Sequence, residues 1–174
     1  MIYIYNIVLQ LYNPHIKKMN PMYKKCMVLY PQLLFIAIIA LCHVRQISYA
    51  YAIGYIVNTC VNYGLKTGFR SVMGDAGNRP MPYYPVQPHS LGGRADAYGF
   101  PSGHAQSVGY FLAFAHQFLP WRAWHPGWIV AAVLVAAWLL HTRVAFRRHT
   151  GIQVLAGFGF GVMVFRLLHS WVRS

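Results

Sequence analysis

The chain has 174 residues, enough for one domain, and 57% of them are hydrophobic while only 10% are charged. Since about a quarter of the residues in a soluble domain are charged, this deficit points to a membrane protein. Fifteen lysines and arginines stand against two carboxylates, Asp75 and Asp96, and the net charge is +13. Two separated carboxylates cannot build a magnesium or calcium site, which argues against a two-metal enzyme; we expect no metal and no other cofactor.

The basic excess predicts a polyanionic partner, either nucleic acid or phosphate headgroups. The basic residues lie at the edges of apolar segments rather than in a stripe interleaved with aromatics, which disfavours nucleic acid. We therefore expect a membrane surface or a phosphorylated lipid as the partner, and no nucleic acid. The sequence leaves the oligomeric state open.

The chain begins with about twelve apolar residues, too few to span a membrane and without the features of a signal peptide. We take residues 1–26 as an apolar and basic N-terminal segment and residues 27–174 as a transmembrane domain. Apolar runs of near-spanning length follow at 27–43, 48–65, 104–119, 127–142 and 151–168. They predict an all-α integral-membrane helical bundle of about five to six transmembrane helices.

Residue types within the runs predict which faces are buried. Polar residues in the third run are expected to face the bundle interior rather than lipid; they are Gln106, Ser107, His116 and Gln117. Small residues in the fifth run permit close helix packing; they are Gly157, Gly159 and Gly161. The stretch 66–103 is polar and rich in glycine and proline, so it is expected to be a long functional loop rather than a helix.

Five spans would place the N-terminal segment, the 66–103 stretch and the 143–150 turn on one membrane face. That face holds eleven of the fifteen basic residues, and the positive-inside rule would put it in the cytoplasm. Several of these charges are also candidates for a phosphate site, so the excess has two explanations.

Two pieces of sequence on that face carry histidines. Pro101-Ser102-Gly103-His104 opens the third run, and a helix that begins in this way presents backbone N–H groups to an anion, with His104 on its first turn. Further on, Arg143 ends one helix and His149 opens the next, so that a turn can bring both toward one point. Gln153 lies four residues after His149, where its amide can orient the imidazole.

A third piece is Lys66 at the end of the second run, with Arg79-Pro80 beyond it. Two histidines beside an anion site suit in-line phosphoryl transfer, in which one attacks phosphorus and the other protonates the departing oxygen. Arginine and lysine then supply the positive charge that metals supply elsewhere.

Taken together, these residues resemble the signature of the phosphatidic acid phosphatase type 2 superfamily, whose motifs are Lys-x6-Arg-Pro, Pro-Ser-Gly-His and Ser-Arg-x5-His-x3-Asp. The second motif is intact at 101–104, and the runs PSGHAQ and HTGIQV look like the dolichyl-diphosphatase branch. The resemblance covers roughly 58–165. It implies a phosphoric monoester or diphosphate hydrolase with His149 as nucleophile, His104 as general acid, and a set of phosphate-binding residues: Lys66, Arg79, Arg143, Ser102 and Gly103.

The chain departs from this signature at three places. Thr142 stands in place of serine, and Gln153 stands in place of the final aspartate. Twelve residues separate Lys66 from Arg79 where the motif has six, so that Arg70 could substitute for one of them. This longer spacing leaves the first motif open.

The expected function is metal-independent hydrolysis of a lipid phosphate or polyprenyl pyrophosphate through a phosphohistidine. Two alternatives remain from the sequence. One is a catalytically weakened membrane protein that binds phospholipid headgroups, and the other is a phosphotransferase that passes the phosphoryl group to a lipid alcohol. The motifs do not separate hydrolysis from transfer, and they do not identify the lipid.

Overall fold

The computed structural model describes residues 21–80, 98–120 and 126–174, with the side chains of 21–28, 126, 128 and 129 left undescribed. Residues 1–20 of the expected N-terminal segment, and residues 81–97 of the expected loop, lie outside the described residues. The chain divides into two compact units, Met1–Tyr30 and Pro31–Ser174. The described part of the first unit is the beginning of a helix.

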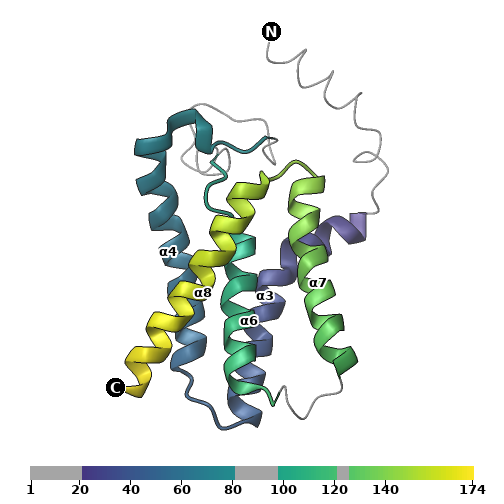
Figure 1. The fold of residues 1–174 in the computed structure, drawn as a ribbon, viewed down its shortest axis with the longest axis vertical. Helices are drawn as coiled ribbons and strands as arrows, with labels where there is room; N and C mark the ends of the chain where they lie inside the picture. The colour runs from purple at the N-terminus through teal and green to yellow at the C-terminus, as the bar shows by residue number, and fades with distance from the viewer. Residues whose placement is uncertain (1–20, 81–97, 121–125) are drawn as a thin grey trace. The chain divides into compact units, whose positions relative to one another are not determined.

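Figure 1 shows the helices α3 (Pro21–Val44), α4 (Ala50–Met73), α6 (Gly103–Phe118), α7 (Pro126–Ala145) and α8 (Gly151–Arg173), with the single-turn 3-10 helix η1 (Gly74–Gly77) after α4. Over the described ranges there is no strand, only one isolated antiparallel bridge between Asn78 and Tyr98. The all-α prediction is confirmed, and each of the five predicted runs corresponds to one helix.

One described helix, Gly151–Arg173, is long and apolar enough by itself to cross a membrane. The apolar stretches Leu29–Val44 and Val130–Ala145 are shorter.

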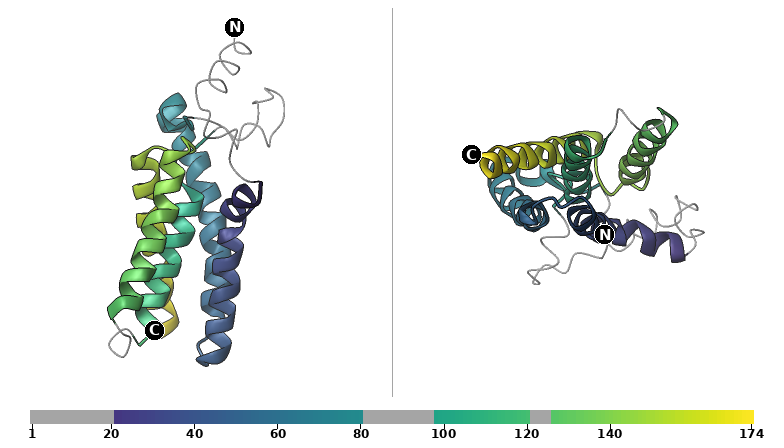
Figure 2. Two further views of the ribbon diagram at one scale, coloured as in Figure 1. Left: turned by 90° about the vertical axis from the view of Figure 1, so that its right-hand side faces the viewer. Right: turned by 90° about the horizontal axis from the view of Figure 1, so that it is seen from below.

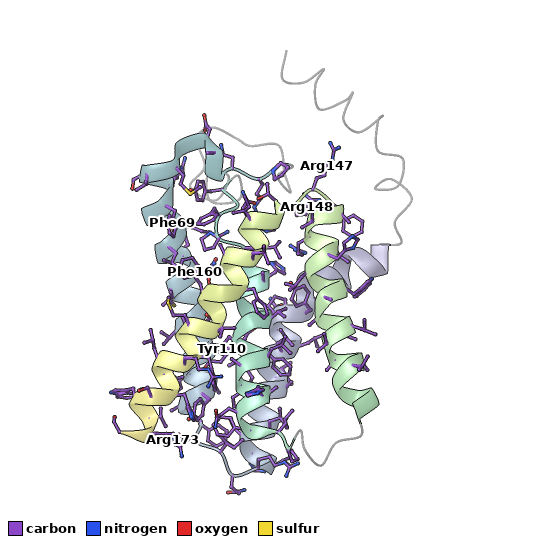
Figure 3. The ribbon with its side chains drawn as sticks, viewed as in Figure 1. Phe69, Tyr110, Arg147, Arg148, Phe160 and Arg173 are labelled. Carbon is purple, nitrogen blue, oxygen red and sulfur yellow. The ribbon has the colours of Figure 1, made fainter. Side chains whose placement is uncertain are left out.

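The end of α4 corrects the sequence analysis. Residues 66–73, which were expected to begin a loop, continue α4 through Met73. No proline interrupts them, and Phe69 packs at their centre, 4.9 Å from the ring of Phe100 and 6.1 Å from that of Phe160 (Figure 3). This aromatic contact joins the end of α4 to α8 and offsets the low helix propensity of Gly68.

The closest helix contact is between α6 and α8, and glycines make it possible. A side chain at Gly157 would strike the backbone carbonyl of Ser102, and one at Gly161 would strike that of Gln106. Small residues spaced by four let two helix backbones approach in this way. The prediction holds for Gly157 and Gly161, but it is wrong for Gly159, whose missing side chain would point into open space.

Away from the glycines, the core is aromatic. Tyr51, Tyr110, Phe114 and Phe165 are at most 3% exposed and pack edge to face or tilted, with Ile38 and Cys42 of α3 beside them. Figure 2 shows α6 among α3, α4 and α8, with α7 at the edge.

The burial predictions for the third run hold only in part. Gln106 and Ser107 are buried and Gln117 is half-buried, but His116 is exposed near the end of α6. Its side chain therefore leaves the bundle where the helix stops, and the expectation that it faces the interior is wrong.

Candidate active site

One face of α4 carries polar side chains toward α6. Asn58, Asn62 and Lys66 are spaced by four, so they share this face. Gln106 of α6 donates to the backbone and side-chain oxygens of Asn58 at 2.8 and 2.9 Å. Asn62 donates to the Gln106 side chain at 2.8 Å and to the carbonyl of Pro101 at 3.4 Å. These buried bonds fix the register of α4 on α6, which directs Lys66 to the beginning of α6.

Lys66 and Arg79 meet in space despite their separation in sequence. Lys66 Nζ donates to the carbonyl of Tyr98 at 3.4 Å, and Arg79 Nε donates to the same oxygen at 3.5 Å. The extra residues extend α4 and then reverse the chain through η1, so that Arg79 returns beside Lys66. Arg70 is exposed. The structure thus brings together Lys66 and Arg79, the pair that the first motif left open.

The beginning of α6 is tied down by Ser102. Its hydroxyl accepts from the N–H of Ala105 at 3.4 Å as an N-cap, and its own N–H donates to the carbonyl of Gln153 at 2.9 Å. Ser102 is fully buried. Gly103 and His104 follow as the first residues of α6, where backbone N–H groups have no acceptor within a helix and the helix dipole favours an anion.

The turn between α7 and α8 fixes the distance from Arg143 to His149. The carbonyl of Arg143 accepts from the N–H groups of Arg148 and His149, both at 3.0 Å, and that of Val144 accepts from Arg147 at 2.8 Å. Arg147 has φ 53°, as the residue after a helix end with this pattern requires. This closed turn explains why five residues separate Arg143 from His149 in the third motif.

His149 is 1% exposed, and both sides of its ring can be assigned. Nδ1 lies 3.0 Å from the carbonyl of Gly99 and 3.3 Å from Oε1 of Gln153. Since both oxygens are acceptors here, Nδ1 carries the proton and Nε2 carries the lone pair. Nε2 is buried and has no hydrogen-bond partner among the described residues.

The charges around this ring keep it neutral. Burial lowers the pKa of His149 from 6.5 to about 2, and the positive charges of Arg79, Arg143 and Lys66 add to the effect, while the bond to Gln153 opposes it. The imidazole is therefore neutral, and the positive charges around its lone pair favour a bound anion over a proton on the ring.

His104 belongs to the same cluster. Arg143, His149, Arg79 and Lys66 all lie within electrostatic reach of it. The structure therefore gathers the charged and histidine residues that the three motifs imply at one end of the helices, with Gly103 beside His104 and Gln153 beside His149. These residues are Lys66, Arg79, His104, Arg143 and His149. No group of three or more histidine, cysteine or acidic side chains among the described residues could hold a metal ion.

Two contributors escaped the sequence analysis. Gly99 and Gly77 act through their backbone carbonyls, which accept from His149 Nδ1 and from Gln153 Nε2. Every residue has such a carbonyl, so the amino-acid type does not show which one will accept a hydrogen bond in the site. The Asn58–Asn62–Lys66 spacing, in contrast, is visible in the sequence and could have predicted the polar face of α4.

The family model described as the PAP2 superfamily matches residues 46–174. The lipid A 1-phosphatase of Rhizobium etli is 41% identical over 70 residues, which is 40% of this chain and 27% of that protein, so the match spans about a quarter of the relative's length. No solved structure matches the chain. Because the family match covers most of the chain and contains the whole candidate site, the chain belongs to the PAP2 superfamily.

Proposed function

We propose that this protein is a membrane phosphatase that hydrolyses a lipid phosphate or polyprenyl pyrophosphate through a phosphohistidine, without a metal ion. The buried lone pair of His149 Nε2 carries the proposal. A nucleophile must be unprotonated and held in one orientation, and the two acceptors at Nδ1 meet both requirements. The similarity to a lipid A 1-phosphatase supports a phosphorylated lipid as the substrate class.

In the proposed reaction, His149 Nε2 attacks the terminal phosphorus, its bond to the bridging oxygen breaks (the lipid oxygen of a lipid phosphate, or the oxygen between the two phosphates of a pyrophosphate), and a proton from His104 neutralises the departing oxygen. Water then attacks the phosphohistidine, the phosphorus–nitrogen bond breaks, and His104 takes back a proton from that water. Inorganic phosphate and a lipid alcohol, or a lipid monophosphate, are released. Lys66, Arg79 and Arg143 balance the charge on the non-bridging oxygens, together with the hydroxyl of Ser102 and the N–H of Gly103.

The outward faces of the helices support a multi-pass arrangement. Large apolar side chains are exposed on four helices, for example Ile53 on α4, Leu134 on α7 and Leu155 on α8, each more than 60% exposed. Apolar surface of this extent on a helical protein is expected to face lipid. We include the cytoplasmic placement of the site in the proposal, on the strength of the basic excess on that face.

Phosphate release in detergent with excess chelator tests the reaction. Purified protein should release phosphate from a lipid phosphate or polyprenyl pyrophosphate, and His149→Ala should lower the rate by at least about a thousandfold, since it removes the nucleophile. Substrate labelled on phosphorus should leave acid-labile label on the wild-type protein and none on the variant. Full activity of His149→Ala, or abolition by chelator, would contradict the proposal.

A leaving-group series tests the role of His104. A nitrophenolate leaves without protonation, whereas a lipid alkoxide needs a proton. His104→Asn should therefore lose far more activity toward a lipid phosphate than toward p-nitrophenyl phosphate. Equal losses on the two substrates would remove His104 from the role of general acid.

A further inference from the structure

The side chain of Gln153 makes bonds in two directions at once. Its Oε1 accepts from the N–H of Thr150 at 3.2 Å and from His149 Nδ1 at 3.3 Å. Its Nε2 donates to the carbonyls of Gly77 and Asn78 at 3.2 and 3.0 Å. An amide has two donor hydrogens and two acceptor lone pairs, and here all four are used. The amide cannot flip, because flipping would set its oxygen against two carbonyls.

The two carbonyls belong to the turn that carries Arg79. Asn78 directly precedes Arg79, and its side chain donates to Asp75 at 2.9 Å within the same turn. The carbonyl of Gly77 also accepts from the N–H groups of Gly99 and Phe100 at 2.9 and 3.1 Å. Because the carbonyl of Gly99 in turn holds His149 Nδ1, the bonds form a closed circuit through Gly77, Gln153, His149 and Gly99.

We propose that Gln153 is a positioning residue that couples the phosphate-binding Arg79 to the imidazole of His149, so that this site requires an amide and not a carboxylate at position 153. A carboxylate could accept from Thr150 and His149, but it has no hydrogens for the carbonyls of Gly77 and Asn78. It would set a negative charge against two carbonyl oxygens, of which that of Gly77 is buried, and the turn bearing Arg79 would move away. The inference rests on the proposed function and concerns how the phosphate-binding Arg79 and the imidazole of His149 are held in position relative to each other.

A pair of variants separates the coupling from simple orientation of the ring. Gln153→Glu keeps the acceptors and loses the donors, while Gln153→Met loses both without adding charge. In both variants His149 Nδ1 retains the carbonyl of Gly99. The coupling predicts that KM for the lipid phosphate rises about tenfold in both, because Arg79 is displaced, with a smaller change in kcat.

Thr150→Ala is the matched control. It removes the hydroxyl that accepts from the N–H of Gln153 at 3.3 Å but leaves the four side-chain bonds in place. It should lower Tm and leave KM within about twofold of wild type, as the loss of a helix cap would. A rise in KM equal to that of Gln153→Met would mean that any loosening of this helix end has the same effect, which would overturn the coupling.

A binding measurement keeps the test independent of turnover. Inorganic phosphate should raise the Tm of the wild-type protein, and the midpoint of this effect should shift to about tenfold higher phosphate in both Gln153 variants. If either variant fails to fold, Gly99→Ala replaces it, because its methyl would press on Gln153 Oε1 and on Arg79 Cγ, 2.5 and 2.9 Å away.

The outcomes distinguish the two proposals. Wild-type affinity for phosphate and wild-type KM in Gln153→Met would overturn the coupling, whatever the activity. A wild-type protein that binds phosphate but releases none from any lipid phosphate would contradict the proposed function, and the phosphate-binding shift would still decide the coupling.

Discussion

Two helices of this protein end with the same backbone pattern and different chemistry. At the end of α3 the N–H of Ile47 reaches the carbonyl of Cys42 at 2.9 Å, and Gln46 between them has φ 52°. At the end of α7 the N–H of Arg148 reaches the carbonyl of Arg143 at 3.0 Å, and Arg147 has φ 53°. Both are helix ends closed by a residue in the left-handed region.

The difference lies in which side chains occupy the paired positions. At the end of α3 they are Cys42 and Ile47, which pack into the aromatic core, as a helix end of this kind normally does. At the end of α7 they are Arg143 and Arg148, with His149 next in the chain. The backbone pattern therefore fixes the spacing at both ends, while the side chains decide whether the helix end packs into the core or forms part of the site. Figure 3 places Arg147 and Arg148 at the opposite end of the helices from Arg173.

The largest expected effect is a loss of activity that follows substitution at the end of α7 but not at the end of α3. Arg143→Gln should lower kcat/KM for a lipid phosphate by about a hundredfold to a thousandfold, because it removes a charge that balances the transition state. Cys42→Ala should leave kcat/KM of the folded protein unchanged and lower its Tm, because it opens a small cavity in the core. Kinetics and thermal unfolding in detergent check both; similar activity losses in the two variants would break the comparison.

The second effect concerns the close contact between α6 and α8. Gly161→Ala should lower the free energy of unfolding by about 1–3 kcal/mol, because its methyl would meet the carbonyl of Gln106. Gly159→Ala, on the open side of the same helix, should raise it by up to about 1 kcal/mol through helix propensity alone. Denaturation of the two variants in parallel tests this, and equal shifts would contradict the close approach at Gly161.

The third effect is the pH dependence of the free energy of unfolding that His149 causes. The pKa of His149 is about 2 in the folded protein against 6.5 ordinarily, so the unfolded chain binds a proton that the folded chain refuses. Its contribution to stability is complete above pH 6.5 and is lost as the pH falls toward 2. Near pH 5 the free energy of unfolding should fall by about 1.4 kcal/mol per pH unit from this group. His149→Gln should show a shallower slope between pH 6.5 and 5; an equal slope would mean that His149 is protonated in the folded state.

The smallest effect tests the two turns directly. Arg147→Gly and Gln46→Gly each relieve a left-handed backbone at the cost of a more flexible unfolded chain, so each should gain up to about 1 kcal/mol. Both side chains are exposed, and activity per folded protein should stay at the wild-type level in both. Lost activity in Arg147→Gly alone would assign the Arg147 guanidinium to the substrate.

Much of the fold could be predicted from hydropathy because each apolar run is long and bounded by polar or breaking residues. The start of α6 was fixed to within one residue by Pro101 and Ser102, since a proline and an N-cap define a helix beginning locally. The end of α4 was not, because Phe69 is held there by Phe100 and Phe160, which are distant in sequence. Gly159 shows the same limit, since one-dimensional spacing does not say which glycine faces a neighbouring helix.

The sequence by itself determined the all-α class and the five-residue spacing from Arg143 to His149, because helices and tight turns depend on contacts within a few residues. It also placed His104 and His149 in two motifs, because a motif is a pattern of neighbouring residues. Only the tertiary structure decided that Arg79 rejoins Lys66 across a twelve-residue separation, and that Gly77 and Gly99 hold the Gln153 amide and the His149 ring. Backbone carbonyls bind by position and not by residue type, so their part in the site becomes visible only when the chain is folded.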